Sequence, residues 1–300
     1  MKLESLKKKL VGPLRILSLP TTICYNRYGK TYADDVHYIT SFMSKVASKM
    51  GDEFDSILFN YKDYVEKQVL LQNSFSIEAG YTNSSYSQIK HIVESSEFQR
   101  ENLYILSLSY IFSPYRYGLY RYVRNSVTRF LKPGDLCLEI GTGTGLDASF
   151  ISLKGINIFS YDINVYSRLC LDILDTQGLV KFQSKFYNFD EEEHFNHCIM
   201  IELLEHLEEP LDYLIKANKI LKKEGTATFT FALRMPQLDH LYLFESFEDA
   251  KKLVEKAGFE ILDHNIFLSS FVDEKNEIAD LKEKDDFNYA ALYACNALKR

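Results

Sequence analysis

The stretch that most constrains this chain is LCLEIGTGTGL, at residues 136–146, an apolar run that ends in an acid and continues into alternating glycines. The apolar residues predict a short buried strand, and residues 147–153 behind the glycines have the pattern of a helix. Glycine adopts positive φ without strain and lets a ligand approach the backbone closely. A strand, a glycine-rich turn and a helix in this order are typical of the first unit of a ligand-binding α/β sheet.

The spacing of the glycines restricts which ligand this turn can receive. Gly141, Gly143 and Gly145 occupy every second position, and Glu139 lies two residues before the first of them. The dinucleotide fingerprint G-x-G-x-x-G requires a third glycine where this chain has Leu146, so the spacing disfavours a pyrophosphate ligand. A carboxylate at this point would repel a pyrophosphate but attract an ammonium group.

The pattern acid-x-Gly-x-Gly-x-Gly resembles the first motif of the class I S-adenosylmethionine-dependent methyltransferases. INIFSYDIN reads as a second strand that ends at Asp162, 21 residues past Gly141. An acid that binds a ribose is expected about 20 residues past the first glycine. FNHCIMIELLEHLEEPLDYLIKANKILKKEG resembles the family's fourth strand, its E-H element, the next helix and a basic-Gly turn. The resemblance extends over residues 129–298, more than half of the chain.

The resemblance implies an α/β fold with a Rossmann-like, doubly wound sheet of seven strands and a terminal antiparallel hairpin. Residues 126–300 would form this domain, and residues 1–125 a mainly helical cap that covers the substrate. The implied cofactor is S-adenosyl-L-methionine, whose methyl group would pass by in-line displacement to a small-molecule acceptor. Two alternatives stay open. One is aminocarboxypropyl transfer or cyclisation with the same cofactor, and the other is a cofactor-binding pseudoenzyme that acts as a partner subunit.

The resemblance also implies which residues contact the cofactor. Asp162 would accept hydrogen bonds from both ribose hydroxyls, and either Asn188 or Asp190 would contact the adenine. Tyr115 and Tyr117 precede the first motif, and their rings can attract a sulfonium by about 0.5 to 2 kcal/mol, although such tyrosines are more often packing residues. The full expected set is Glu139, Gly141, Thr142, Gly143, Gly145, Asp162, Ile163, Asn188, Glu202, Tyr115 and Tyr117.

The expected catalytic residues follow the fourth and fifth strands. His206 comes after the fourth strand, and Asp239 and His240 come after the fifth. Neighbouring loops at the carboxyl ends of parallel strands converge on one crevice, so these side chains should face one another. An imidazole near its reference pKa of about 6.5 can accept a proton near neutrality. We therefore predict His206 as a general base, with His240 or Asp239 opposite it.

Composition limits the partners. A net charge of −7 and a pI of about 5.6 argue against an extended nucleic-acid surface. The five cysteines are odd in number and scattered, as expected for reduced thiols in a cytoplasmic protein. His194 and His197 lack a third ligand of zinc-like spacing, so no metal is expected. No segment approaches the about 20 apolar residues of a membrane span, and the interrupted N-terminal apolar run does not resemble a signal peptide. We expect a monomer or a homodimer.

The first third of the chain is expected to be helical. Apolar residues recur at intervals of three and four over residues 33–50 and 54–71, and less regularly over residues 88–112. Because such apolar stripes must be buried, these helices should pack on each other or over the mouth of the following domain. The alternative to a cap is an extension that only stabilises the domain.

The remaining elements are expected in the family's order. A helix is predicted at residues 165–174, a third strand within LVKFQSKFYNFD and a fourth strand at residues 198–201. Pro210 suits the first turn of a helix that Gly225 should end before a strand at residues 226–233. Ser246 and Asp249 resemble a capping box for a helix at residues 247–257. FEILDHNIFLSS and NYAALYACNAL predict two closing strands, separated by a charged loop at residues 273–286.

Overall fold

The structure is a computed structural model of the 300-residue chain, which describes residues 1–76, 80–185, 187–188, 192–268 and 290–300. A seven-stranded sheet has the order β3-β2-β1-β4-β5-β7-β6. Its strands are β1 Leu136–Ile140, β2 Asn157–Asp162, β3 Val180–Ser184, β4 Phe195–Met200, β5 Leu221–Leu233, β6 Phe259–Leu268 and β7 Ala291–Lys299. β7 is antiparallel to both β5 and β6, whereas the other pairs are parallel. The predicted doubly wound sheet with a terminal antiparallel hairpin is confirmed.

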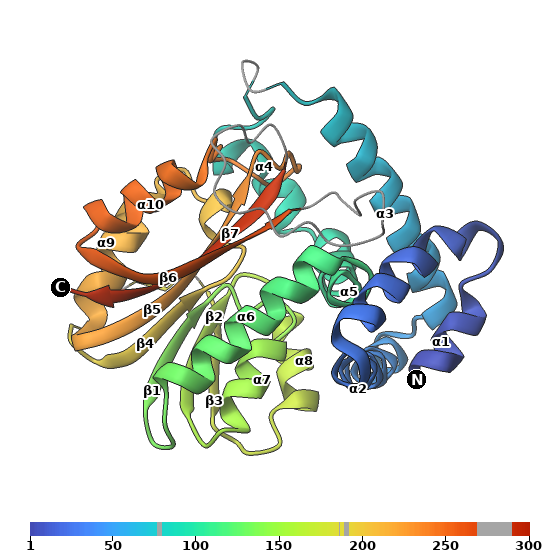
Figure 1. Ribbon diagram of the computed structural model, residues 1–300, viewed down its shortest axis with the longest axis horizontal. Helices are drawn as coiled ribbons and strands as arrows, with labels where there is room; N and C mark the ends of the chain where they lie inside the picture. Colours follow the sequence, from blue (N-terminus) through green and yellow to red (C-terminus); the bar gives the residue numbers. More distant parts are fainter. Residues whose placement is uncertain (77–79, 186, 189–191, 269–289) are drawn as a thin grey trace.

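Helices cover both faces of the sheet (Figure 1). One face carries α6 Pro114–Phe130, α7 Leu146–Ser152 and α8 Ser167–Leu174, and the other carries α9 Pro210–Ile220 and α10 Phe247–Lys256. Side chains alternate along each strand, so β1 contributes Leu138 and Ile140 to the core under α9 and α10, and Cys137 to the core under α7. The strand order reverses between β1 and β4, where open α/β sheets bind their ligands.

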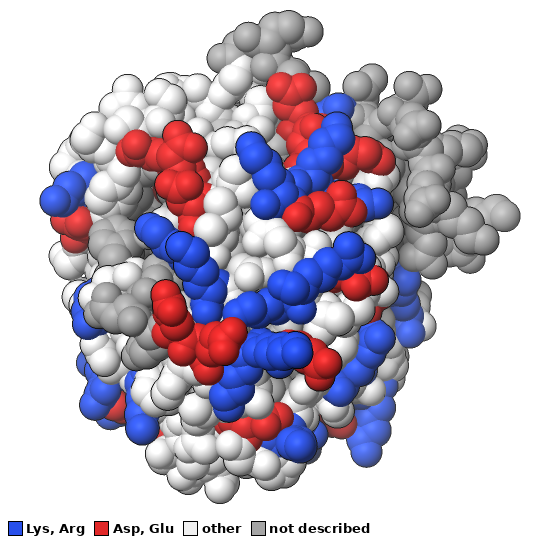
Figure 2. Space-filling view, turned by 90° about the vertical axis from the view of Figure 1, so that its left-hand side faces the viewer, with Lys and Arg blue, Asp and Glu red and all other residues white. Residues whose placement is uncertain are grey.

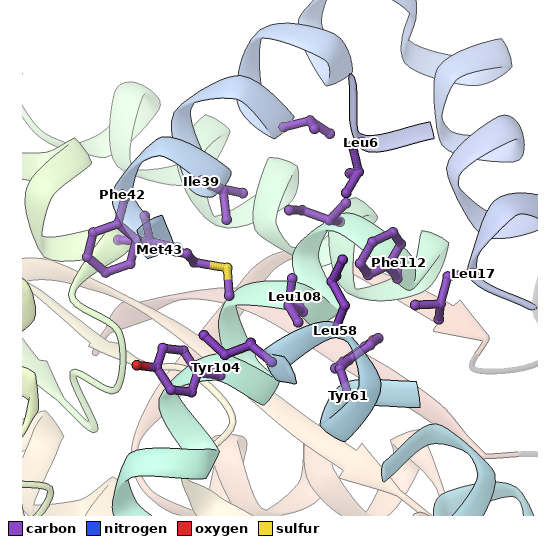
Figure 3. Close-up of a cluster of buried hydrophobic side chains, with 14 of the residues drawn as sticks. Leu6, Leu17, Ile39, Phe42, Met43, Leu58, Tyr61, Tyr104, Leu108 and Phe112 are labelled. Carbon is purple, nitrogen blue, oxygen red and sulfur yellow. The ribbon is translucent and has the colours of Figure 1, made fainter. Parts of the chain in front are cut away.

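The N-terminal helices form a third layer that shares its core with the sheet domain. They are α1 Leu3–Lys9, the 3₁₀ helix η1 Gly12–Leu17, α2 Ser18–Met50, α3 Phe54–Ser74, α4 Tyr86–Val93 and α5 Ser96–Phe112. Figure 3 shows Leu6, Ile39, Leu58 and Leu108, from four of these helices, gathered in one apolar cluster. The same cluster includes residues of α7 and α8, namely Leu146, Cys170 and Leu174. The predicted division at residue 125 falls inside α6, and the two regions pack as one body.

Several predicted boundaries need correction. The helix predicted at residues 88–112 is two helices, because Ser95 caps α5 by accepting a hydrogen bond from the Phe98 N–H. Gly225 does not end α9. The helix ends at Ile220, because Leu221 is already extended and pairs with Phe195 in the sheet. Ser246 caps α10 by accepting a hydrogen bond from the Asp249 N–H, but its hydroxyl, and not its backbone N–H, donates to the Asp249 carboxylate, so only half of the predicted capping box forms. The predicted charged loop lies outside the described residues.

Two observations concern possible partners. In the described part of the chain, none of the helices combines the length and the hydrophobicity that a membrane span requires. The face that carries α9 and α10 is drawn in Figure 2, where described basic side chains are interspersed with acidic ones.

Candidate active site

The glycine motif forms the loop between β1 and α7. Gly141, Gly143 and Gly145 have φ values of 85°, 50° and 72°, which explains why this loop needs glycine. Gly141 and Gly143 line a cavity, together with Thr142 between them. Gly145 does not line it. A Cβ atom at Gly145 would lie 2.7 Å from Cδ2 of Leu171, so this glycine permits close packing of α7 on α8.

Glu139 is buried at the carboxyl end of β1 and lines the same cavity. Its Oε2 accepts a hydrogen bond of 2.7 Å from the Ser160 hydroxyl. Burial raises the pKa of Glu139 to about 8, and this effect outweighs the opposing hydrogen bond. A ligand ammonium beside the carboxyl would favour its ionised form, as expected for the amino-acid end of the cofactor.

Asp162 connects the glycine loop to the end of β2. Its Oδ2 accepts a hydrogen bond of 2.6 Å from the Gly143 N–H, and its Oδ1 accepts one of 2.7 Å from the Asn164 N–H. Burial raises its pKa, while these two N–H donors oppose the increase. The side chain lines the cavity, and carboxylate oxygens can accept more than one hydrogen bond each. Asp162 can therefore position the loop and still bind ribose hydroxyls.

Of the two residues predicted to contact the adenine, the structure describes only Asn188. Ile163 lines the cavity, but Asn188 does not, and Asp190 lies outside the described residues. Tyr187 lines it instead, with its ring centroid 4.6 Å from that of Tyr161, which also lines the cavity. The aromatic residue beside Asn188 was the available signal, because a ring can stack on a base.

The structure does not bring Tyr115 and Tyr117, which were predicted as cofactor contacts, to the surface of the cavity. Tyr117 is completely buried, and its hydroxyl donates a 2.7 Å hydrogen bond to Asp35 of α2. Tyr115 packs in a separate cluster with Leu119. Consecutive helical residues point about 100° apart, so Arg116 lines the cavity where its two neighbours cannot.

Arg116 and Glu202 form an ion pair in the wall of the cavity, in the part that also contains Glu205. Arg116 Nη1 lies 3.0 Å from Glu202 Oε2, and the two side chains are only 8% and 11% exposed. Glu202 has a φ of 51° just after β4, and its N–H donates a hydrogen bond to Thr230 Oγ1. Glu202 was predicted from the sequence as a cofactor residue. Arg116 was missed, because a lone basic residue in a tyrosine-rich run gave no motif.

The loops after β4 and β5 meet in this same part of the cavity. His206 is in a short 3₁₀ helix, η2 Leu204–His206, and its ring centroid lies 4.8 Å from that of His240, nearly perpendicular to it. His206 Nδ1 lies 2.9 Å from the Asp239 carbonyl oxygen and 3.4 Å from its carboxylate. Burial disfavours charge on His206, but the carboxylates of Asp239 and Glu205 outweigh it and raise the pKa. Burial lowers the pKa of His240 well below its usual range.

The cavity that joins these groups has a volume of about 460 Å³. The N-terminal helices build one wall with Ile89 and Val93 of α4, Gln99 and Leu106 of α5 and Arg116 of α6. The ends of β1, β2 and β4 build the opposite wall. The predicted residues on the cavity surface are Glu139, Gly141, Thr142, Gly143, Asp162, Ile163, Glu202, His206, Asp239 and His240.

A family model described as a methyltransferase domain matches residues 115–264, half of the chain. The chain belongs to the class I S-adenosylmethionine-dependent methyltransferases. Its cofactor is S-adenosyl-L-methionine. The matched region begins at Tyr115, so the methyltransferase domain includes all of α6 except its first residue.

Solved structures share the fold of this methyltransferase at low sequence identity. N-methyltransferase NodS from Bradyrhizobium japonicum WM9, in complex with S-adenosyl-l-homocysteine, is 11% identical, with 72% of this chain and 99% of that chain covered and a TM-score of 0.52. The [4+2]-cyclase SpnF is 17% identical, with 60% and 80% covered and a TM-score of 0.47. No curated protein gives a significant sequence match. At 11% identity the likeness to NodS shows the fold and leaves the acceptor open.

Proposed function

We propose that this methyltransferase transfers the methyl group of S-adenosylmethionine to an oxygen or nitrogen of a small-molecule acceptor. The observation that supports this most directly is the cavity of about 460 Å³, which has helices α4 to α6 on one wall and polar side chains on its surface. Its size falls within the about 300 to 1,000 Å³ of small-molecule sites. A cavity of this size has little room for a polymer beside the cofactor.

The polarity of the cavity suggests how the two ligands share it. The ribose lies at Asp162 and the amino-acid end of the cofactor near Glu139, so the acceptor takes the end with Arg116, Glu202 and His206. The acceptor atom attacks the methyl carbon, the C–S bond breaks, and its electron pair stays on sulfur to give S-adenosylhomocysteine. The acceptor atom gives up its proton, and the polar side chains at this end are placed to assist that loss.

Two further observations support a proposal for the compartment and for the role of the N-terminal helices. All five cysteines are buried free thiols, and from this we infer a reducing cytoplasmic environment. Leu106 of α5 lies against the glycine loop, with its Cδ1 3.3 Å from the position of a Cβ atom on Gly143. We infer that the N-terminal helices hold ligands in the cavity and do not only stabilise the fold.

The test uses methyl-labelled cofactor with a panel of phenols, catechols, alcohols, amines and small carboxylic acids. We expect a labelled small product and one S-adenosylhomocysteine per methyl group transferred. Methylthioadenosine as the product would instead support aminocarboxypropyl transfer, and cofactor binding with no product from any acceptor class would support the pseudoenzyme.

A pair of variants links turnover to the cavity. Leu106→Trp should fill the space between α5 and the glycine loop and abolish transfer. Leu70→Trp on α3, where the native side chain is 70% exposed, should leave transfer unchanged. Equal activity of the two variants would contradict the placement of the reaction in this cavity.

A further inference from the structure

Three side chains of the kinds that bind metal ions meet at the acceptor end of the cavity. Glu205 and His206 come from η2, and His240 comes from the segment after β5. One ligand atom from each residue can be chosen such that all three lie within 4.8 Å of one another. The sequence predicted no metal, because His194 and His197 lack a third ligand of zinc-like spacing. We propose that Glu205, His206 and His240 bind a divalent transition-metal ion.

In both histidines the hydrogen bond of Nδ1 leaves the other ring nitrogen, Nε2, available to a metal ion. His206 Nδ1 lies 2.9 Å from the Asp239 carbonyl oxygen, and His240 Nδ1 lies 2.7 Å from the Met235 carbonyl oxygen. A carbonyl oxygen only accepts, so in both rings Nδ1 carries the proton and Nε2 of the neutral ring keeps its lone pair. Metal-binding histidines are typically oriented by such a bond from the other ring nitrogen.

The side chain of Glu205 supplies an independent observation that points to a bound cation. Its side chain is completely buried and lines the cavity, yet neither carboxylate oxygen has a hydrogen-bond partner among the described residues. Burial, together with the nearby Glu202 carboxylate, raises its pKa to about 8. A buried carboxyl group without partners is costly to the fold, and coordination of a cation would satisfy both of its oxygens.

The charges around the cluster also favour a cation. Glu202, Glu205 and Asp239 place three carboxyl groups at this end of the cavity, and Arg116 is the guanidinium that also lines it. Arg116 is paired with Glu202, which leaves the Glu205 carboxyl group for a bound ion. Asp239 lies beside His206, where it strengthens that ring as a ligand.

The set of two imidazoles and one carboxylate selects the class of metal. Such ligands suit zinc, manganese, cobalt or iron, whereas magnesium and calcium prefer oxygen ligands alone. Three protein ligands are the number found at catalytic zinc sites, which keep a position open for water or substrate. Bonds of about 2.0 to 2.2 Å require the three side chains to close inward on binding.

The role of the ion rests on the proposed function. An acceptor oxygen in the open position would have its pKa lowered, as occurs for metal-bound water. The hydroxyl proton leaves to water, the oxygen attacks the methyl carbon, and the C–S electron pair remains on sulfur. In this arrangement Nε2 of His206 is a metal ligand, which replaces its predicted role as a free general base.

The test measures metal binding without any acceptor. Full-length protein is treated with a chelator, dialysed and titrated with Zn²⁺ and Mn²⁺ by calorimetry, and the absorption of added Co²⁺ reports the ligand set. We expect one ion per chain. Removal of a group that only orients a metal ligand lowers metal affinity by about 10- to 100-fold. Because Glu205→Gln and His240→Ala each remove a ligand itself, each should lower metal affinity by more than this. His37→Ala, which removes an exposed imidazole of α2, should bind as the native protein does.

A second measurement separates ligand loss from misfolding. Because Glu205 has no side-chain partner to lose, metal-free Glu205→Gln should melt no lower than the metal-free native protein, and added metal should no longer raise its melting temperature. Absence of binding at one ion per chain, or equal affinity in Glu205→Gln, overturns the site. Labelled product formed without any bound metal overturns this inference alone. Metal binding without product from any acceptor overturns the proposed function alone.

Discussion

Replacing Asp162 by alanine tests whether this carboxylate binds the cofactor ribose. The carboxylate already accepts hydrogen bonds from Gly143 and Asn164, so the variant loses these two contacts as well as those to the ribose hydroxyls. A hydrogen bond to a charged group contributes about 1.5 to 3 kcal/mol. Since each 1.4 kcal/mol is about a tenfold change in affinity, S-adenosylhomocysteine should bind about 10- to 150-fold more weakly.

A matched variant separates ribose binding from loop anchoring. Asp175 follows α8 and also accepts backbone hydrogen bonds, from Gly178, Leu179 and Val180, but it does not line the cavity. Asp162→Ala and Asp175→Ala should therefore both lower the free energy of unfolding, and only Asp162→Ala should weaken S-adenosylhomocysteine binding in titration calorimetry. Native affinity in Asp162→Ala, or the same loss in both variants, would refute the assignment of Asp162 to the ribose.

Two further predictions concern stability. Gly145→Ala places a Cβ atom 2.7 Å from Cδ2 of Leu171, whereas Gly178 has a similar positive φ but open space around it. In urea unfolding, Gly145→Ala should therefore lower the free energy of unfolding by about 1 to 3 kcal/mol more than Gly178→Ala does. Burial lowers the pKa of His197 to about 3, so below about pH 6.5 the unfolded chain takes up a proton that the native state does not. Between pH 7.5 and pH 5.5 the native protein should therefore lose about 1.4 kcal/mol relative to His197→Gln, and parallel pH profiles from chemical unfolding would contradict this.

The parts of the site that the sequence predicted are those that depend on local chain order. Glu139 lies on β1 and the glycines lie in the turn that follows it. The length of α7 determines that the next strand, β2, ends at Asp162 beside this turn. The three therefore come together in any sheet of this topology.

The parts that the sequence missed depend on contacts between distant segments. Whether Tyr115, Arg116 or Tyr117 faces the cavity is decided by the rotation of α6 against the sheet and α2, which a tyrosine-rich run does not encode. Glu205 meets His240 only because the loops after β4 and β5 are neighbours in the folded sheet. Their spacing along the chain matches no metal motif, so only the fold reveals the cluster.

The most direct test of this account is a crystal structure of the full chain with S-adenosylhomocysteine. We predict that the ribose hydroxyls lie within hydrogen-bond distance of the Asp162 carboxylate and that the thioether sulfur faces the end of the cavity with Glu202 and His206. A cofactor bound elsewhere, or a sulfur directed away from the two histidines, would contradict the placement of the acceptor and of the reaction.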